Sequence, residues 1–524
     1  MTPSVEGGPA PVPPSGVSRR TVVVSALWTS AMALVSVPVS AVTTIFLARL
    51  LEADAFGRFA LYGFLFTTLP GIAELGIGTT IIRRGALAAG SGDEPGLLAA
   101  VRAGTTWSLL QLPWSVGLAF LLLPSTTAAL LYSAAATASL CALGPSHYLV
   151  MTSNLKRASQ VRLLVLLLNA GATLATAALT HRADLTFGMS SLSSAVLTFA
   201  QVLGVPQEHR RKVFRPGRLS LTRADLGFGL GTLLNGQLTN FVFSRSEVLF
   251  FRPTQGVDRG RFAAAQTLAA RSTLLVDALL GNVSTALTSA AGRSGTQLRA
   301  SLELVCEAVS LLLLFVAPMV LAAIAVLAEP LLGDDYSGIA AAGCLLAAIS
   351  LLQTAASPLL SLRFANGSVR PLLIAGSSGA LVNAGAAAAL VPADGFRGAV
   401  AANALGTATY LAVTVWQFRG DDLEWRSLAV RHMRRMSLLV LLACVPAAVL
   451  LVLDERLEVL LAAPLALLCS FLLTRLPALP PDRDAVGTIL VAVLREKRAH
   501  AVQQSAAFRC VFPEQSPSAG RTRS

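Results

Sequence analysis

Seven charged residues interrupt long apolar stretches of this sequence, and their chemistry calls for a physical explanation. They are Glu74, Arg245, Glu247, Arg271, Asp277, Glu303 and Glu307. If these stretches cross a bilayer, a charge near its centre costs roughly 2.5–3.5 kcal/mol, so each residue should face a partner or a wet cavity. Glu303 and Glu307 are four residues apart on one helix face, and capping or pairing with loop arginines accounts for both.

Arg245 and Arg271 admit two interpretations. In the first, each arginine pairs with Glu247, Asp277 or Glu74 and only holds helices together. In the second, both arginines bind an anionic head group inside a cavity. A guanidinium suits phosphate because it stays charged and donates two parallel hydrogen bonds. Depth along the apolar stretches predicts Arg245 in the outer half of the membrane and Arg271 near its middle.

The segment from Phe46 to Arg84 recurs weakly 203 residues later in one ungapped register. The matched pairs are Arg49 and Arg252, Gly57–Ala60 and Gly260–Ala263 (both GRFA), Glu74 and Asp277, and Gly78 and Gly281. Self-similarity at a fixed spacing indicates a duplicated unit.

The duplication predicts equivalent depths for Glu74 and Asp277. Together with Glu247, these acids either carry protons or sodium ions for coupling or act as counter-ions to the arginines. Arg49 and Arg252 take equivalent places at the predicted outer mouth, with Arg58 and Arg261 beside them in the sequence. These four arginines either form a basic rim that attracts the substrate or lie in surface loops where water solvates them.

The composition identifies the broad class. Of the 524 residues, 54% are hydrophobic and 13% are charged, whereas about a quarter are charged in soluble domains. A chain of this length and composition is a polytopic membrane protein. Its net charge of +13 does not indicate a nucleic-acid partner, because the arginines lie in short loops between apolar segments.

Several chemistries are not expected. No lysine follows a glycine, so the sequence encodes no Walker A site for ATP. The six cysteines lack paired spacing, and the five histidines show no metal-site pattern, so neither a metal, a disulfide framework nor a cofactor is expected. Catalytic residues are not expected either, and a proton or sodium gradient is the energy source that remains.

The hydropathy pattern predicts an all-α polytopic protein with about fourteen transmembrane helices, since each apolar stretch reaches the roughly 20 residues that a bilayer requires. The stretches lie near 21–48, 57–82, 104–123, 126–150, 161–180, 185–205, 224–251, 260–290, 300–328, 338–362, 371–391, 395–418, 435–453 and 457–475. The repeat matches span 1 to span 7, six helices later. Because six is even, the copies enter the membrane in the same direction, which predicts two parallel, pseudo-symmetric six-helix lobes plus two C-terminal helices.

Loop charges predict the topology. One alternating set of loops, with both tails, holds about thirty basic residues and the other about eight, so the positive-inside rule places both termini in the cytoplasm and the chain in the cytoplasmic membrane. The predicted parts are a disordered cytoplasmic tail (1–20), an N-lobe (21–205), a basic cytoplasmic linker (206–223), a C-lobe (224–418), two further spans (419–475) and a cytoplasmic tail (476–524).

Several short motifs carry a family resemblance. They are Ala48–Leu51 (ARLL), Phe56–Leu61 (FGRFAL), Glu74–Gly78 (ELGIG), Ser244–Leu249 (SRSEVL) and Gly333–Ala340 (GDDYSGIA). With the span count and the duplication, they resemble Wzx-type polysaccharide flippases of the multidrug/oligosaccharidyl-lipid/polysaccharide (MOP) exporter superfamily. The resemblance covers about residues 20–475.

This resemblance implies translocation of a polyprenyl-pyrophosphate-linked oligosaccharide by alternating access of two lobes, without enzymatic activity. It implies a pyrophosphate site, for which Arg245 and Arg271 fit best, with Arg49 and Arg252 at the rim. Membrane lipids, a polysaccharide polymerase and glycosyltransferases are the implied partners. The chain departs from the family at Asp277, where many relatives have no acid, and in its near lack of lysine.

Further functions remain open on the sequence alone. A drug or cation antiporter of the same superfamily would favour acids and aromatic residues in its cavity, whereas this chain places arginines there. A lipid II flippase and a membrane glycan polymerase also remain open. For the polymerase, the loop that holds Glu329, Asp334 and Asp335 is too small for a sugar-binding domain.

Overall fold

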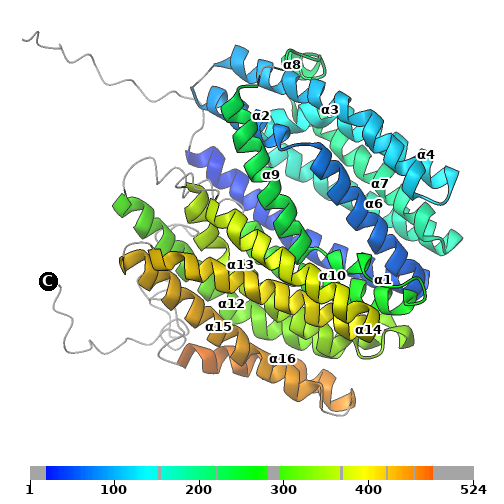
Figure 1. Cartoon of the computed structure of the whole chain (residues 1–524), viewed down its shortest axis with the longest axis vertical. Helices are drawn as coiled ribbons and strands as arrows, with labels where there is room; N and C mark the ends of the chain where they lie inside the picture. The colour runs from blue at the N-terminus through cyan, green and yellow to red at the C-terminus, as the bar shows by residue number, and fades with distance from the viewer. Residues whose placement is uncertain are drawn as a thin grey trace, which may run out of the picture. The chain divides into compact units, whose positions relative to one another are not determined.

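The computed structural model describes residues 19–91, 93–151, 155–219, 221–280, 295–365, 370–420, 423–452 and 455–475. Every regular element within these ranges is helical (Figure 1). The prediction of an all-α fold is therefore confirmed. Two compact units emerge, the first from residues 1–32, 70–172 and 188–233, the second from the remainder. The predicted division into the lobes 21–205 and 224–418 stays a prediction.

The first unit is built on α2 and α3, which pack against each other and on α5. Its elements are α2 (Ile77–Ser91), α3 (Glu94–Leu122), α4 (Thr126–Cys141), α5 (Leu143–Met151), η1 (Gln201–Gly204), α8 (Gln207–Arg210) and parts of α6 (Leu155–Thr180), α7 (Ala183–Ala200) and α9 (Arg223–Phe243). Buried side chains such as Ile81, Val101 and Leu149 form its core. The side chain of Asp93 caps α3 by accepting a hydrogen bond from the Gly96 N–H.

The second unit holds the larger helical bundle, in which α12, α13 and α15 lie side by side and α10 packs on α13 (Figure 1). Its elements are η2 (Ser246–Leu249), α10 (Gly256–Leu280), α12 (Gly295–Leu332), η3 (Asp334–Tyr336), α13 (Ile339–Ala365), α14 (Arg370–Trp416), η4 (Gln417–Gly420), α15 (Leu423–Leu450) and α16 (Glu455–Arg475). Residues 33–69 of α1 (Arg19–Ala73) belong to it as well. Large fully buried side chains, among them Phe262, Leu313 and Leu346, fill its core.

Two pairs of predicted spans are joined by kinks rather than by loops. Helix α1 is interrupted at Glu52, whose φ is 59°, and α14 is interrupted at Gly395, whose φ is 54°. A single residue in the left-handed region redirects a helix without a separate loop. The predicted spans 21–48 and 57–82, and likewise 371–391 and 395–418, therefore meet at these kinks.

The structure also interrupts the predicted span 57–82. Helix α1 ends at Ala73 and α2 begins at Ile77. Leu75 and Gly76 between them have φ of 53° and 68°, values that glycine adopts far more readily than leucine. A β-carbon on Gly76 would lie 1.9 Å from the carbonyl oxygen of Gly229 in α9, so this break also allows close packing of the two backbones.

By length and composition, five helices of the described residues could cross a membrane, and the bent pair α4 and α5 would make a sixth. One of the five covers the whole of residues 370–420, which contain two predicted spans. Most of the about fourteen predicted spans fall on one helix or on one side of a helix kink. The predicted spans 57–82 and 126–150 each cross a break between two helices, and 260–290 extends past the described residues. The predicted helix count is thus roughly consistent with the structure.

The two GRFA blocks of the repeat contact each other. A β-carbon on Gly57 would lie 2.8 Å from the backbone nitrogen of Gly260, and one on Gly260 would lie 1.8 Å from the carbonyl oxygen of Ala53. Small residues let helix backbones approach closely where lipid supplies no hydrophobic driving force. The duplicated glycines therefore form the crossing point of α1 and α10.

Candidate functional site

The turn that follows α9 in the second unit and the short helix η2 after it hold two of the predicted site residues, Arg245 and Glu247. Arg245 lies in this turn, between Phe243 at the end of α9 and the start of η2. Its backbone is left-handed, with φ 58° and ψ 26°, a conformation uncommon for a residue other than glycine. Its side chain is partly buried.

Polar side chains from α10 and α14 cap the final carbonyl groups of α9. The Phe243 oxygen accepts a hydrogen bond from Gln266 at 3.0 Å. The Val242 oxygen accepts from the side-chain nitrogens of Asn383 at 3.3 Å and Asn403 at 3.1 Å. Since the last carbonyls of a helix lack intrahelical partners, these contacts hold the turn in place.

The buried acid Glu247 is held by the same two asparagines. Its Oε1 accepts hydrogen bonds from Asn383 at 2.8 Å and from Asn403 at 2.9 Å, and the residue is 0% exposed. The asparagines lie on opposite sides of the kink in α14 at Gly395. Within the described residues, therefore, Glu247 is bonded to neutral amides and not to an arginine, and its Oε2 has no hydrogen-bond partner there.

Arg271 in α10 is partly buried, and its Nε is buried without a hydrogen-bond partner among the described residues. With Ser272 beside it, Arg271 lines a largely apolar cavity of about 260 Å³ whose wall also includes residues of α1 and α12, such as Ile45 and Leu327. Neither Arg271 nor Arg245 forms an ion pair with an acid that the structure describes. Because the side chain of Asp277, one of the predicted partners, is outside the described residues, both interpretations stay open.

A second, polar cavity of about 240 Å³ lies among α9, α10, α13 and α14 of the same unit. Its wall includes Asn235, Thr273, Gln353, Thr354, Ser357 and Tyr410. The side-chain oxygen of Asn235 is buried and has no partner in the described part of the chain. Uncharged amides and hydroxyls of this kind exchange hydrogen bonds with hydroxyl groups of a ligand.

Of the two acids predicted to match across the repeat, the structure describes the side chain of Glu74 but not that of Asp277. Glu74 lies in the break between α1 and α2, where its carboxylate accepts a hydrogen bond from the backbone N–H of Gly78 in the first turn of α2. The backbone of Asp277 lies in α10, but its side chain is outside the described residues. Gly281, the partner of Gly78 in the repeat, is outside them as well.

The other two acids pair as the sequence predicts. Glu303 forms an ion pair with Arg299 at 3.0 Å, one turn earlier on α12. Glu307 receives two hydrogen bonds of 2.8 Å from one nitrogen of Arg435 in α15. Pairing with nearby arginines is thereby confirmed for both, and neither belongs to the candidate site.

Two of the four rim arginines bind the last turn of α12 or the connection that follows it. Arg49 donates to the carbonyl oxygen of Pro330 at 2.6 Å, and Arg261 donates to that of Asp335 at 2.7 Å. Arg58 pairs with Asp54 at 2.7 Å, one turn away. Arg252 is exposed, and its backbone N–H donates to the Gln255 side chain at 2.9 Å. Thus Arg49 stabilises the end of a helix, and Arg252 alone of the four forms no side-chain hydrogen bond or ion pair with the described residues.

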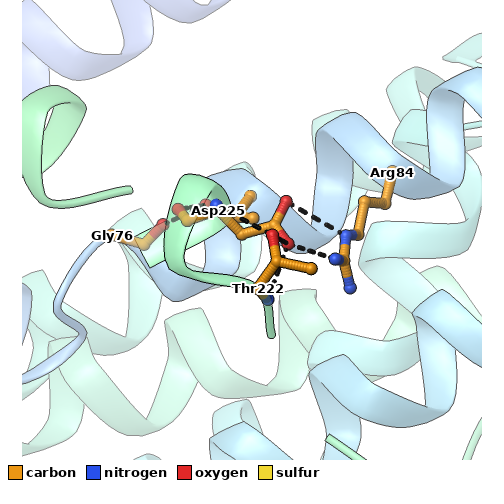
Figure 2. A network of polar contacts seen from close by, with 5 residues as sticks. Gly76, Arg84, Thr222 and Asp225 are labelled. Carbon is orange, nitrogen blue, oxygen red and sulfur yellow. Dashed lines mark hydrogen bonds and ion pairs between the residues drawn. The ribbon is translucent and has the colours of Figure 1, made fainter. Parts of the chain in front are cut away.

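The first unit contains a different arrangement of charge, a closed network around the start of α9 (Figure 2). Arg84 forms an ion pair with Asp225, and its Nε donates at 3.2 Å to the same carboxylate. Thr222 and Asp225 bond each other's backbone N–H groups, which is the capping-box pattern at a helix start. The Thr80 hydroxyl is 3.2 Å from both the Gly76 and the Asp225 carbonyl oxygens.

Sequence reasoning missed Asn383 and Asn403. Each is the single asparagine of a predicted apolar span, and the two are 20 positions apart. A buried amide must find a partner in the protein, so an asparagine at each of two predicted mid-span positions was an available signal. Their shared partner, Glu247, could not be read from the sequence because it depends on the kink between them.

The second unit is a helical bundle with two partly buried arginines, Arg245 and Arg271, and the enclosed acid Glu247. Comparisons with known proteins identify the fold of the chain. No protein-family model and no curated protein matches the chain. Solved structures do match it. An inward-facing MATE-family multidrug resistance transporter of the MOP superfamily aligns with a TM-score of 0.56 and 14% identity, over 77% of this chain and 98% of that structure.

Two further structures broaden the comparison. The lipid II flippase MurJ, in an inward closed conformation, matches with a TM-score of 0.51 and 13% identity, over 86% of this chain and 99% of its own. A MOP superfamily transporter from Pyrococcus furiosus, described as having a binding pocket of reverse polarity, matches with a TM-score of 0.50 and 16% identity, over 78% and 96%. The chain therefore has the fold of MOP superfamily transporters, as its sequence motifs predict.

Proposed function

We propose that this chain is a flippase that moves a polyprenyl-pyrophosphate-linked oligosaccharide, a precursor of a cell-surface polysaccharide, across the cytoplasmic membrane by alternating access. The fold suits this proposal, because it occurs in transporters in both inward-facing and outward-facing conformations and in a lipid II flippase. Fold alone does not choose a substrate. The choice of substrate rests on the charges inside the second unit.

One observation carries the proposal. Arg245 and Arg271 are two partly buried guanidiniums of the second unit, both inside predicted spans, and neither pairs with a described acid. Such charges are poorly solvated, so an anion that contacts them stabilises both. A pyrophosphate offers several oxygens to two guanidinium forks, which makes it a better occupant than a single carboxylate.

The polar cavity supports a carbohydrate as the second part of the substrate. Sugar hydroxyls both donate and accept hydrogen bonds, and the amides and hydroxyls around Gln353 and Tyr410 can do the same. A cationic drug would instead require an acid with a free carboxylate. In the described residues, Glu247 is enclosed by two asparagines and the other acids discussed above are bonded to arginines or backbone.

Glu247 is our candidate for the coupling residue. If both asparagine amides rotate by 180°, their oxygens instead of their nitrogens face the Glu247 carboxylate and the Val242 carbonyl oxygen. The orientation of an amide follows its hydrogen-bond partners, so a bound cation would favour this arrangement. Carboxylate, amide and carbonyl oxygens together suit a hard cation such as Na⁺. A proton is the alternative, since the Oε2 of Glu247 has no hydrogen-bond partner among the described residues and is the atom that would carry it.

The proposal is tested with purified protein in proteoliposomes that contain a fluorescent undecaprenyl-pyrophosphate-linked disaccharide. Chemical quenching from outside reports how much of the lipid has reached the outer leaflet. We expect the double substitution R245Q/R271Q to reduce flipping at least about 100-fold, since each charge-assisted contact is worth about 1.5–3 kcal/mol. The double lysine variant keeps both charges but loses the forks, so it should retain partial activity.

R84Q is the matched control, because Arg84 already has Asp225 as its partner. It should flip lipid at close to the normal rate. Unchanged flipping by R245Q/R271Q would contradict the pyrophosphate role. Uptake of a cationic dye that these substitutions leave intact would instead favour the antiporter, and selective flipping of lipid II would narrow the substrate to that lipid.

A further inference from the structure

A groove of about 580 Å³ opens between the C-terminal part of α14 and the N-terminal half of α15 in the second unit. Three arginines line it: Arg419 in η4, and Arg426 and Arg434 in α15. The rest of its wall is largely apolar and includes Val415 and Met433. It therefore combines a long apolar surface with three positive charges.

The spacing of the lining residues explains the shape of the groove. On α15 they are residues 426, 430, 433, 434 and 437, which recur at one face of a helix. From Arg426 to Ser437 this face extends roughly 16 Å at 1.5 Å per residue. At its edge, Trp416 is 56% exposed and Val430 is 44% exposed, so apolar side chains remain open to the surroundings.

The three groove arginines differ from the arginines around them. Arg435 binds Glu307, and Arg299 binds Glu424. Arg363 donates to the Gln417 carbonyl at 3.2 Å. Arg431 points to the Ser427 carbonyl at 3.2 Å on its own helix.

The groove arginines have no ion pair and no hydrogen bond with any residue that the structure describes. Arg419, Arg426 and Arg434 are also exposed. Charges gathered at an apolar groove while their neighbours are neutralised indicate a binding surface for an anion that also has an apolar part.

We infer that this groove binds an anionic membrane phospholipid, with the headgroup phosphate at the three arginines and an acyl chain along the apolar wall. The groove lies where two helices connect, on the side that the loop charges place in the cytoplasm. The cytoplasmic leaflet carries the anionic lipids, and basic pockets between helices recognise their headgroups. Tryptophan is enriched at that same depth of the bilayer, where Trp416 would lie.

This inference does not depend on the proposed flippase activity, because it concerns a resident lipid at the surface and not a transported substrate. Phosphatidylglycerol supplies both parts of the expected ligand. Phosphatidylcholine has the same chains but no net charge, and inorganic phosphate has the charge without the chains. Comparing the three probes distinguishes a lipid site from a site for free anions.

The test is native mass spectrometry of the full-length protein in detergent, titrated with each of these probes. The wild-type chain should bind phosphatidylglycerol at least tenfold more tightly than phosphatidylcholine. The variant R419Q/R426Q/R434Q should weaken phosphatidylglycerol binding by up to about 100-fold, at about fivefold per arginine, and should leave phosphatidylcholine unchanged. Inorganic phosphate should compete only weakly with the lipid.

The control variant R211Q/R215Q/R218Q removes three exposed arginines from the predicted cytoplasmic linker 206–223, so it matches the change in charge. It should bind phosphatidylglycerol as the wild type does, and an equal loss would overturn the inference. Full competition by inorganic phosphate would overturn the lipid assignment. If the triple variant is unstable, quenching of Trp416 fluorescence by a spin-labelled phosphatidylglycerol, measured against W416F, gives an independent result, and its absence would contradict the site.

Discussion

The two copies of the repeated segment differ in what their charges do. In the first copy, Arg58 pairs with Asp54, Glu74 caps the start of α2, and Arg84 joins the capping network of α9 (Figure 2). In the second copy, Arg271 has no described acidic partner. What the copies share, the GRFA block, forms a contact between them. The shared residues therefore serve the fold, and the unshared charges are where function is to be sought.

Among the variants tested for stability, removal of the Glu247 carboxylate, two residues before the second copy begins, should have the largest effect on the second unit. Glu247→Ala would leave the amides of Asn383 and Asn403 facing a cavity. A buried donor that loses its partner commonly costs about 1–3 kcal/mol, and this variant leaves two of them. The midpoint of thermal unfolding in detergent should fall clearly below that of the wild type.

Glu247→Gln is the matched control for this experiment. It keeps the side-chain volume and one acceptor oxygen, so less than half of the loss is expected. If Glu247 also couples transport to an ion, this variant should lose the dependence of flipping on a sodium or proton gradient while remaining folded. Equal stability of the alanine variant and the wild type would show that the asparagine contacts contribute nothing.

The shared GRFA contact is the next feature to test. Gly260→Ala places a methyl group against the Ala53 carbonyl oxygen, and overpacking of this kind costs about 1–3 kcal/mol. Gly63→Ala on α1 is the control, because a β-carbon there meets nothing within 4 Å and alanine favours helix. Solubilised protein should unfold at a lower temperature only for the first variant. Similar behaviour of both would mean that the crossing is loose.

Most of the helices could be predicted from the sequence, because apolar segments of bilayer length indicate helices directly. The GRFA repeat and the pairing of Glu303 with Arg299 were readable because they depend on spacing along the chain, whereas the partner of Glu307, Arg435, lies on another helix. The kinks at Glu52 and Gly395 were not readable, because a helix that turns at one residue leaves no loop in the hydropathy pattern. The kink at Gly395 also brings Asn383 and Asn403 to Glu247, so these partners could not be predicted from the sequence.

The capping box of α9 should have a moderate effect. Thr222→Ala removes the hydroxyl that accepts from the Asp225 N–H, and loss of such a cap typically costs about 1 kcal/mol. Thr222→Ser keeps the hydroxyl and should be close to wild type. Thermal unfolding of the two variants, measured side by side, checks this. A serine variant as unstable as the alanine variant would point to the lost methyl group instead.

The smallest expected effect is the most direct test of the difference between the two copies. Arg84→Gln breaks an ion pair that is partly exposed to solvent, so a loss of up to about 1 kcal/mol is expected. Arg271→Gln removes a partly buried charge that has no described partner, so stability should stay the same or rise slightly. The two unfolding midpoints should therefore move in opposite directions or differ measurably.

The double variant R84Q/D225N serves as the control for the first half of this test. It removes both charges of the pair and should recover part of what R84Q loses, because no unpaired carboxylate remains. A matching loss for R271Q would mean that Arg271 is held by a stabilising contact, and its role would then be to join helices. If R271Q instead keeps full stability while flipping is lost, the charge is retained for the substrate and not for the fold, as expected where a binding site is built at the expense of stability.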